Sequence, residues 1–256
     1  MMDSGLASSL FDVSGKIACV TGASSGLGRR AADVLLRAGC RVVGVARRAD
    51  MLADWSGGHD GRAGFVTGDL ADRSGLNSIV QAVDDVFGPP DILINAAGIN
   101  TRETADEVTA ANWNLTLDLN LAAPFFLAQA FVPSMKDKGF GRIVNFASLQ
   151  SFRAFPGGVA YGASKGGISQ LTRSMAESWS PHGITANALA PGFFQTELTA
   201  AVFNDRERAD LNASQTCIGR NGELSDIDGP VLFLCSQASS YITGQVLSVD
   251  GGYTAK

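Results

Sequence analysis

The sequence predicts an α/β protein built on one doubly wound, parallel sheet of seven strands with helices on both faces. Short β-branched runs alternate with longer amphipathic stretches along the whole chain. The runs are continuously apolar, which is typical of strands that are covered on both faces. No linker, low-complexity segment or internal repeat interrupts the pattern, so residues 1–256 are expected to form a single domain.

Seven strands are expected, at residues 16–22, 41–47, 63–70, 90–98, 141–148, 183–192 and 244–252. Helices are expected over 27–38, 73–87, 110–138, 160–181 and 226–237, with a loop-and-helix segment at 193–215. Pro181 ends the fourth of these helices because proline cannot continue a helix. Right-handed crossovers between parallel strands then place the ligand crevice at the carboxyl ends of the strands.

The composition limits the class of protein further. The chain has 256 residues, of which 45% are hydrophobic and 18% charged, and this suits a compact protein. A net charge of −5 without a basic stripe argues against a nucleic-acid partner. The start of the chain lacks a secretory pattern, and no uninterrupted apolar run approaches the roughly 18 residues that span a bilayer. We therefore expect a cytoplasmic protein without a membrane partner.

Cysteine and histidine chemistry is not expected at the site. The four cysteines are Cys19, Cys40, Cys217 and Cys235. Their spacing is neither C-x-x-C nor a disulfide framework, so they are expected to be reduced, buried thiols. The two histidines stand in no motif, which leaves no predicted metal site and no Ser-His-Asp triad.

The segment "TGASSGLG" (21–28) joins the first expected strand to the first helix. Gly22 permits a tight turn, and Gly26 and Gly28 let backbone approach a ligand. Free amides at the start of the helix then face an anion such as a pyrophosphate, as in a Rossmann dinucleotide site. An ordinary strand-helix turn is the alternative. The expected cofactor contacts in this turn are Gly22, Ser24, Ser25, Gly26, Leu27 and Gly28.

The end of the second strand bears on the choice of cofactor. A carboxylate there hydrogen-bonds the ribose 2′-hydroxyl of NAD, whereas arginine suits the 2′-phosphate of NADP. In "VGVARRAD", Ala46 holds the acidic position and Arg47 and Arg48 follow. The sequence therefore favours NADP with Arg47 as its reader, with NAD left open; the alternative is a solvated loop. Asp69, which ends the third strand, can accept from the adenine amine or cap the next helix.

Tyr161 and Lys165 lie four positions apart in "YGASK" (161–165). Residues at this spacing share a helix face. A neighbouring positive charge favours the phenolate and lowers a tyrosine pKa toward neutrality, which would make Tyr161 a usable acid and base. For the pair alone, a half-buried tyrosine beside a lysine that reaches solvent is the simpler interpretation.

Seven motifs decide the matter because they occur together and in order. They are "TGASSGLG" (21–28), "NAAG" (95–98), Asn120, Ser148, "YGASK" (161–165), "APG" (190–192) with Thr196 beyond it, and "VDGG" (249–252). Over nearly its whole length the chain thereby resembles the short-chain dehydrogenases/reductases. Ala96 departs from the family's commoner second asparagine, which removes one amide but keeps the site small.

The resemblance implies roles for the motif residues. Tyr161 would be the general acid/base, and Lys165 would lower its pKa and hold the nicotinamide ribose. Ser148 would hold the substrate oxygen, and Asn120 would anchor a water that relays protons from Lys165. Further cofactor contacts would come from Asp69, Leu70, Asn95, Ala96, Gly98, Phe194 and Thr196. Hydride transfer belongs to the cofactor, while the protein supplies orientation and proton handling.

The substrate is expected to be a sugar acid or polyol. Residues 96–114, 145–157 and 191–202 resemble the sugar-acid and polyol dehydrogenases of the family. Arg102 or Arg153 could clamp a carboxylate through two parallel hydrogen bonds. The other expected substrate contacts are Ser148, Gln150 and Tyr161. The alternatives are a 3-oxoacyl-(acyl-carrier-protein) reductase, which shares the same catalytic set, and a non-catalytic dinucleotide-binding protein.

The resemblance also bears on assembly and motion. Residues 193–215 would form a mobile lid over a small-molecule substrate, and such lids gate product release. Related enzymes are commonly tetramers, so a homotetramer is expected. The stretch "LTLDLNLAAPFFLAQAFV" (115–132) is apolar around most of a helix, as a symmetric interface or a well-buried helix would require.

Overall fold

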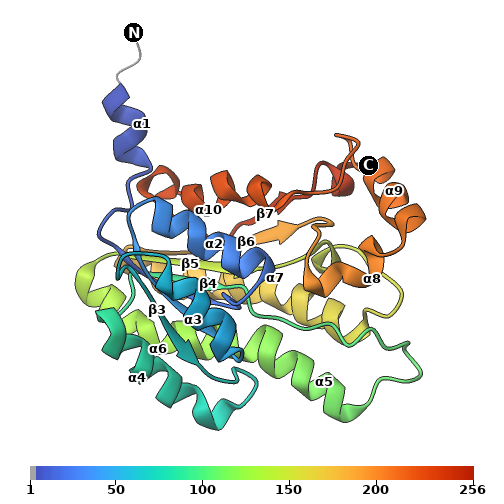
Figure 1. Cartoon of the computed structure of the whole chain (residues 1–256), viewed down its shortest axis with the longest axis horizontal. Coiled ribbons are helices and arrows are strands. Elements are labelled where there is room, and N and C mark those ends of the chain that lie inside the picture. Colours follow the sequence, from blue (N-terminus) through green and yellow to red (C-terminus); the bar gives the residue numbers. More distant parts are fainter. Residues whose placement is uncertain (1–3) are drawn as a thin grey trace.

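The sheet predicted from the sequence is present. In the computed structural model, which describes residues 4–256, seven parallel strands form one sheet in the order β3-β2-β1-β4-β5-β6-β7 (Figure 1). The order runs outward in both directions from the neighbours β1 and β4. The connections from β1 and from β4 therefore run in opposite directions along the sheet. This leaves a crevice at the carboxyl ends of these two strands. The predicted fold class is confirmed.

The elements have the following bounds. The strands are β1 (Ile17–Thr21), β2 (Arg41–Ala46), β3 (Ala63–Thr67), β4 (Ile92–Asn95), β5 (Gly141–Phe146), β6 (Ile184–Pro191) and β7 (Val246–Val249). The helices are α1 (Ser4–Leu10), α2 (Gly26–Arg37), α3 (Ala49–Gly57), α4 (Leu76–Phe87), α5 (Ala110–Leu117), α6 (Ala123–Lys138), α7 (Val159–Trp179), α8 (Ala200–Phe203), α9 (Arg206–Gln215) and α10 (Asp228–Cys235). Three short segments lie near the site, namely the π-helical η2 (Asp118–Ala122) and the 3-10 turns η3 (Leu149–Ser151) and η5 (Glu197–Thr199).

Helices cover both faces of the sheet, so each strand has an apolar neighbour on either side. Helices α2, α3 and α10 pack on one face, and α4, α6 and α7 pack on the other (Figure 1). Every residue of β1, β4, β5 and β6 is buried. Burial on both faces explains why these strands are continuously apolar rather than alternating.

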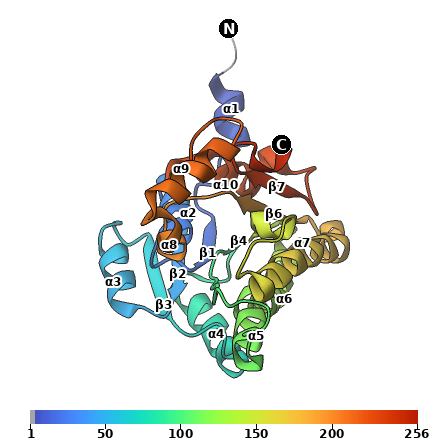
Figure 2. The same ribbon diagram turned by 90° about the vertical axis from the view of Figure 1, so that its right-hand side faces the viewer.

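The register of the strands brings their carboxyl ends to one edge. Thr21 of β1 pairs with Val45 of β2 and with Asn95 of β4, and Asn95 pairs with Asn145 of β5. The residues that follow these strands consequently share one edge of the sheet. Helices α8 and α9 lie at this same end of the protein (Figure 1). In Figure 2 this end is turned toward the viewer.

The long helix expected over 110–138 is interrupted. Residues Asp118–Ala122 form a π-helical turn between α5 and α6, and Asn120 lies in it. Such bulges are rare and frequently mark functional sites. The combined stretch Ala110–Lys138 contains an 18-residue window with a mean hydropathy of 1.4, which is long and apolar enough to cross a membrane by length and composition alone. Half of that window is buried inside the protein. A core helix of a globular domain passes the same test of length and composition.

Three expectations were wrong or incomplete. Helix α1, which projects away from the sheet (Figures 1 and 2), and helix α3 between β2 and β3 are not in the sequence-based prediction. Helix α3 buries only Leu52 and Trp55, so its apolar stripe is too short to stand out. The Trp55 indole is nevertheless fixed by donating to Asp33 Oδ1 at 2.9 Å. Cys217 is exposed rather than buried, because it lies in the loop after α9.

Candidate active site

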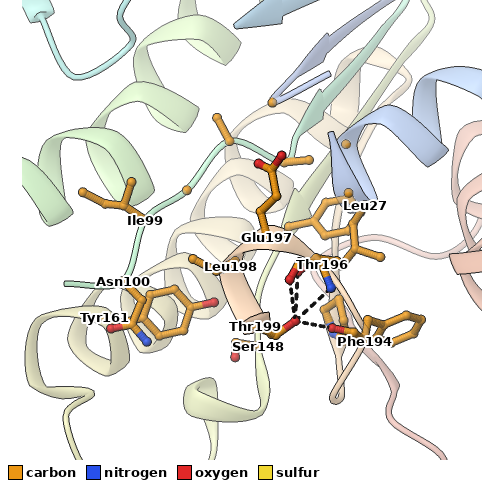
Figure 3. A pocket seen from close by; sticks show the side chains of 18 of the residues that line it. Leu27, Ile99, Asn100, Ser148, Tyr161, Phe194, Thr196, Glu197, Leu198 and Thr199 are labelled. Carbon is orange, nitrogen blue, oxygen red and sulfur yellow. Dashed lines mark hydrogen bonds between the residues drawn. The ribbon is translucent and has the colours of Figure 1, made fainter. Parts of the chain in front are cut away.

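A cavity of about 750 Å³ opens at the carboxyl edge of the sheet. Its walls come from the turn after β1, the ends of β2, β4 and β5, the start of α7, and the segment from Pro191 to Gln215. This is the switch point of the sheet, where α/β proteins of this kind bind ligands. Figure 3 shows part of this cavity, with Tyr161 and Ser148 on one wall and Leu27 on another.

The glycine-rich turn has the backbone geometry that a phosphate site requires. Gly22 has a φ of 72°, and a Cβ atom there would lie 2.9 Å from the Ala97 nitrogen. A Cβ atom on Gly28 would lie 2.4 Å from the Gly22 carbonyl oxygen. Only glycine fits at these two positions, and helix α2 begins at Gly26 with free amides facing the cavity edge. The turn can therefore hold a pyrophosphate on backbone donors.

The two arginines after β2 both line the cavity, but they are held differently. Arg48 donates from Nη2 to Ser24 Oγ at 2.8 Å and to Ser25 Oγ at 2.7 Å, which ties it to the glycine-rich turn. Its Nη1 lies 3.0 and 2.9 Å from the two carboxylate oxygens of Glu197. The Arg47 side chain lines the cavity without an ion pair to any residue within 4–256. The sequence favours NADP because Arg47 and Arg48 both follow β2, with Arg47 predicted to contact the 2′-phosphate. In the structure, Arg48 occupies the more defined position.

These residues together fit a dinucleotide that carries a 2′-phosphate. The glycines leave room for the pyrophosphate, and two guanidinium groups stand where the adenosine ribose would meet the end of β2. Asp69 also lines the cavity, and its Oδ1 accepts from the Ala71 amide at 3.0 Å, a local turn contact. Residues Leu70, Ala96 and Gly98 complete the wall on this side.

Helix α7 positions the proposed acid/base. Tyr161 and Lys165 are both buried on its inner face, and Lys165 Nζ lies 5.6 Å from the centroid of the Tyr161 ring. The ammonium donates to the Phe146 carbonyl oxygen at 2.6 Å, which anchors it to the end of β5. Ser148 follows the same strand, and its hydroxyl hydrogen-bonds the Tyr161 phenol. The structure thus brings Ser148, Tyr161 and Lys165 together in the cavity.

Burial is the largest influence on the ionisation of this pair. It raises the pKa of the Tyr161 phenol, while the hydrogen bond from Ser148 and the charge of Arg102 act in the opposite direction. Burial also lowers the pKa of Lys165 to about 8. The expected lowering of the Tyr161 pKa by Lys165 is not seen in this state, because desolvation disfavours both charged forms. The phenol is protonated at neutral pH and is a proton donor.

Asn120 has a structural contact that the sequence did not reveal. Its Oδ1 accepts from the Ile99 amide at 2.9 Å, and its Nδ2 donates to the Ile99 carbonyl at 2.9 Å and to Ser164 Oγ at 3.1 Å. Asn120 does not line the cavity, whereas Ile99 and the neighbouring Gly98 do. The π-helical turn therefore uses Asn120 to hold the wall after β4 against α7.

The segment after β6 folds over the cavity. Phe194 is buried, and Thr196 lies against the glycine-rich turn, since a Cβ atom on Gly26 would be 3.4 Å from the Thr196 Cβ. Thr199 Oγ1 accepts from the Thr196 amide at 3.0 Å and contacts the Phe194 carbonyl (Figure 3). These bonds fix the short turn at Glu197–Thr199. Farther along, Arg208 and Asn212 of α9 face the same cavity.

One of the two expected carboxylate-binding arginines lies in the cavity. Arg102 lines it, donates from Nη2 to the Leu198 carbonyl at 2.6 Å, and is near enough to Tyr161 to influence its pKa. Gln150 lines it too, and its Oε1 is buried without a hydrogen-bond partner among the described residues. Arg153 does not line the cavity. It donates to the Lys256 carbonyl at the other end of the chain and lies over the Tyr253 ring.

Most of the sequence-predicted residues therefore converge on one cavity. Those that line it are Gly22, Ser24, Ser25, Gly26, Leu27, Gly28, Arg47, Asp69, Leu70, Ala96, Gly98, Arg102, Ser148, Gln150, Tyr161, Lys165, Phe194 and Thr196. Asn95 does not, because its side chain is buried within the fold and donates to Asn145 Oδ1 at 2.9 Å. The lining residues absent from the prediction include Arg48, Glu197, Arg208 and Asn212.

Comparisons with known proteins agree with this geometry. A family model described as enoyl-(acyl carrier protein) reductase matches residues 22–254. Gluconate 5-dehydrogenase of Gluconobacter oxydans is 41% identical over 96% of this chain and 97% of its own length. The crystal structure of a gluconate 5-dehydrogenase from Burkholderia cenocepacia in complex with NADP and tartrate is 34% identical, has a TM-score of 0.92, and is matched over 98% of this chain and 99% of that one. A 3-oxoacyl-(acyl-carrier-protein) reductase of Vibrio cholerae is 34% identical over 94% of this chain and 98% of its own.

The fold and the site thus define an oxidoreductase that uses a nicotinamide dinucleotide and acts on CH–OH groups. The chain belongs to the short-chain dehydrogenase/reductase family. The resemblance inferred from the seven motifs is confirmed.

Proposed function

We propose that the protein is an NADP-linked dehydrogenase that interconverts a secondary alcohol and a ketone on a sugar acid such as gluconate. The observation that carries this proposal is the position of Arg102. Its guanidinium lines the cavity close enough to Tyr161 for its charge to act on the phenol. A carboxylate held there would present a neighbouring hydroxyl carbon to the acid/base. The similar gluconate 5-dehydrogenases support the same class of substrate.

The backbone at Arg102 supports a functional placement. Arg102 has a φ of 56°, a left-handed conformation that non-glycine residues adopt rarely. The Asn100 side chain stabilises it by accepting from the Arg102 amide at 3.1 Å. Backbone strain of this kind costs about 1–3 kcal/mol and is concentrated at functional sites. From this position the Arg102 side chain donates to the Leu198 carbonyl oxygen at 2.6 Å.

The proposed chemistry divides between cofactor and protein. When bound, the nicotinamide supplies or accepts the hydride. In the reductive direction, Tyr161 donates its proton to the carbonyl oxygen of the substrate, and Ser148 holds that oxygen by a hydrogen bond. In the oxidative direction, Tyr161 acts in its phenolate form and accepts the proton of the substrate hydroxyl. Lys165 and the Ser148 hydroxyl stabilise the phenolate that forms in the reductive direction.

Several finer features belong to the same proposal. NADP is preferred over NAD because Ala46, and not a carboxylate, holds the acidic position at the end of β2, and two arginines follow it. Asn120 takes part by positioning the wall after β4 and by relaying protons through a water to Lys165. Residues 193–215 act as a lid. The protein is a single domain without a nucleic-acid or membrane partner.

We also propose a cytoplasmic homotetramer. Exposed apolar side chains on the long helices and near the last strand support an interface, since a monomer rarely exposes so many. They include Leu115, Phe126, Val159, Tyr241 and Leu247. Cysteines without disulfides suit a reducing compartment. Size-exclusion chromatography with light scattering tests the assembly, and a monomeric mass would contradict it.

A reductase of 3-oxoacyl thioesters is the second candidate. The lid contributes the apolar side chains of Leu198, Val202 and Leu211 to the cavity, and these suit an acyl chain. The Vibrio cholerae relative supports this reading as well. A non-catalytic binding protein is disfavoured because Ser148, Tyr161 and Lys165 are all present and converge.

A substrate panel separates the two candidates. Purified protein is assayed with NADP and NAD against sugar acids, the matching neutral polyols, and short 3-hydroxyacyl thioesters, by following the absorbance of reduced nicotinamide. Turnover of sugar acids with NADP supports the first candidate. Turnover of thioesters alone would replace it with the second.

A further inference from the structure

The Glu197 carboxylate of the lid occupies two donors, one in the turn after β1 and one after β2. Glu197 Oε2 accepts from Ser25 Oγ at 2.9 Å and from Arg48 Nη1 at 2.9 Å, and Oε1 accepts from the same Nη1 at 3.0 Å. The Ser25 hydroxyl in turn accepts from Arg48 Nη2 at 2.7 Å. Glu197, Arg48 and Ser25, which all line the cavity, therefore form a closed ring of hydrogen bonds.

This ring lies where a 2′-phosphate would bind. Arg48 is the second residue after β2, and Ser24 and Ser25 belong to the glycine-rich turn, which can hold a pyrophosphate. The adenosine ribose of a dinucleotide lies between these two segments. The donors that Glu197 uses are thus the donors available to a phosphate at the ribose 2′-position. Such a phosphate is an anion like Glu197, so both cannot occupy the same donors.

Glu197 is an anion held by one cation, Arg48, and by the Ser25 hydroxyl. Its hydrogen bond from Ser25 and its ion pair with Arg48 lower the pKa of the Glu197 carboxyl below its ordinary value, so it is ionised at neutral pH. Arg47 lines the same part of the cavity without a partner of its own among residues 4–256. The side chains of Glu197 and Arg48 are 61% and 42% exposed, which makes their pair weak enough for a ligand to displace.

Glu197 also belongs to the segment that faces the substrate. The next residue, Leu198, accepts from Arg102 through its carbonyl oxygen. The turn Glu197–Thr199 is thereby attached to the cofactor side by Arg48 and to the substrate side by Arg102. In Figure 3 the Glu197 carboxylate points away from Tyr161, which agrees with a role at the cofactor rather than in the proton transfer.

We propose that Glu197 is a cofactor-selecting residue whose carboxylate competes with the 2′-phosphate of NADP for Arg48 and Ser25. The inference rests on the proposed function, because it takes a dinucleotide to be the ligand of this cavity. Competition of this kind weakens NADP and leaves NAD, which has a 2′-hydroxyl, nearly unaffected. Glu197 thereby reduces the difference in affinity between NADP and NAD that the arginines after β2 create.

Binding of nucleotide fragments tests this without catalysis. Isothermal titration calorimetry measures the Kd of adenosine 2′,5′-bisphosphate and of 5′-AMP for the wild-type protein and for Glu197→Gln. We expect Glu197→Gln to bind the bisphosphate about two- to tenfold more tightly, since an exposed ion pair contributes about 0.2–1 kcal/mol and the lost repulsion adds to it. Binding of 5′-AMP is expected to stay unchanged.

Two further variants make the test specific. Glu207→Gln removes the same charge from an exposed position on α9 that does not line the cavity, and it is expected to change neither Kd. Glu197→Gln made in an Arg48→Ala protein is expected to gain much less for the bisphosphate than it does alone, because the donor for which the two anions compete is gone.

The outcomes separate this inference from the proposed function. An equal gain in Glu207→Gln, or weaker bisphosphate binding in Glu197→Gln, would overturn the competition. An unchanged ratio of the two Kd values in Glu197→Gln would overturn the competition as well. If both nucleotides still bound in that case, the proposed dinucleotide site would stand. Failure of the wild-type protein to bind either nucleotide would overturn the proposed function and this inference together.

Discussion

Lys165 Nζ lies 5.6 Å from the centroid of the Tyr161 ring, and both side chains are buried on one face of α7. No carboxylate pairs with this ammonium within residues 4–256; its hydrogen bond goes to the Phe146 carbonyl. A buried cation without a counter-charge is costly for the fold. A buried, unpaired ammonium beside a buried phenol in a cavity is what a site of proton transfer requires, and it marks this pair as a candidate for that chemistry.

Replacement of Tyr161 by phenylalanine tests the acid/base assignment. The ring and its packing stay, and only the hydroxyl that exchanges the proton is lost. We expect kcat to fall by at least about a hundredfold, which is the usual share of general acid-base catalysis. Cofactor binding, measured by calorimetry, is expected to remain close to wild type. Turnover near the wild-type rate in Tyr161→Phe would refute the mechanism.

Replacement of Lys165 by methionine is expected to abolish most activity and yet stabilise the protein at pH 7. Below pH 8 the lysine is charged in both the folded and the unfolded state, so its burial cost is fully present. After the lost hydrogen bond to Phe146 is subtracted, we expect a gain of about 1 kcal/mol in the free energy of unfolding.

The pH dependence of that gain gives the control. The folded state releases the Lys165 proton at about 8, and the unfolded state releases it near the ordinary value of 10.5. Wild-type stability therefore rises relative to Lys165→Met as the pH increases through this window. Urea unfolding at pH 7, 8.5 and 10 measures the difference in the free energy of unfolding between the two proteins. A difference that stays constant across these values would contradict the assignment.

Arg48 is expected to contribute more than Arg47 to NADP recognition. Arg48 is fixed by Ser24 and Ser25, whereas Arg47 has no such partner among the described residues. Arg48 therefore loses less conformational entropy than Arg47 when a phosphate binds. We expect Arg48→Ala to raise the Kd of NADP by about tenfold or more and that of NAD by much less. Fluorescence titration with NADPH and NADH measures both. Equal losses for the two cofactors would show that Arg48 does not read the 2′-position.

Arg102→Ala is expected to raise KM for a sugar acid by about tenfold or more, because a charge-assisted contact to the carboxylate is lost. The KM of the matching neutral polyol is expected to change little. Arg153→Ala is the matched control, since Arg153 lies outside the cavity at the Lys256 carbonyl. If both arginine variants, or both substrates, respond alike, the carboxylate contact of Arg102 is excluded.

The sequence predicts the sheet because buried parallel strands are continuously apolar, and it predicts the turn after β1 because only glycine fits at Gly22 and Gly28. It does not predict contacts that depend on the path of the chain between elements. The residue after Ser148 begins a turn that carries Arg153 to the C-terminal end, and Glu197 meets Arg48 across 149 positions. Neither contact leaves a periodic pattern in the sequence.

The ionisation of Tyr161 shows the same limit at the site. The spacing of Tyr161 and Lys165 predicts that they share a helix face, and they do. The direction of the tyrosine pKa in this state depends on how deeply both groups are buried, which a spacing cannot reveal. The π-helical turn at Asn120 is likewise a property of packing between α5, α6 and α7.

The most direct test of the central claim compares D-gluconate with D-sorbitol, its neutral polyol counterpart, as substrates of the purified protein with NADP. The two differ at one end, where gluconate has the carboxylate that Arg102 would bind. We expect kcat/KM to be at least about tenfold higher for gluconate, as one charge-assisted contact provides. Equal values for both substrates, or activity with neither and turnover of 3-hydroxyacyl thioesters instead, would contradict the account.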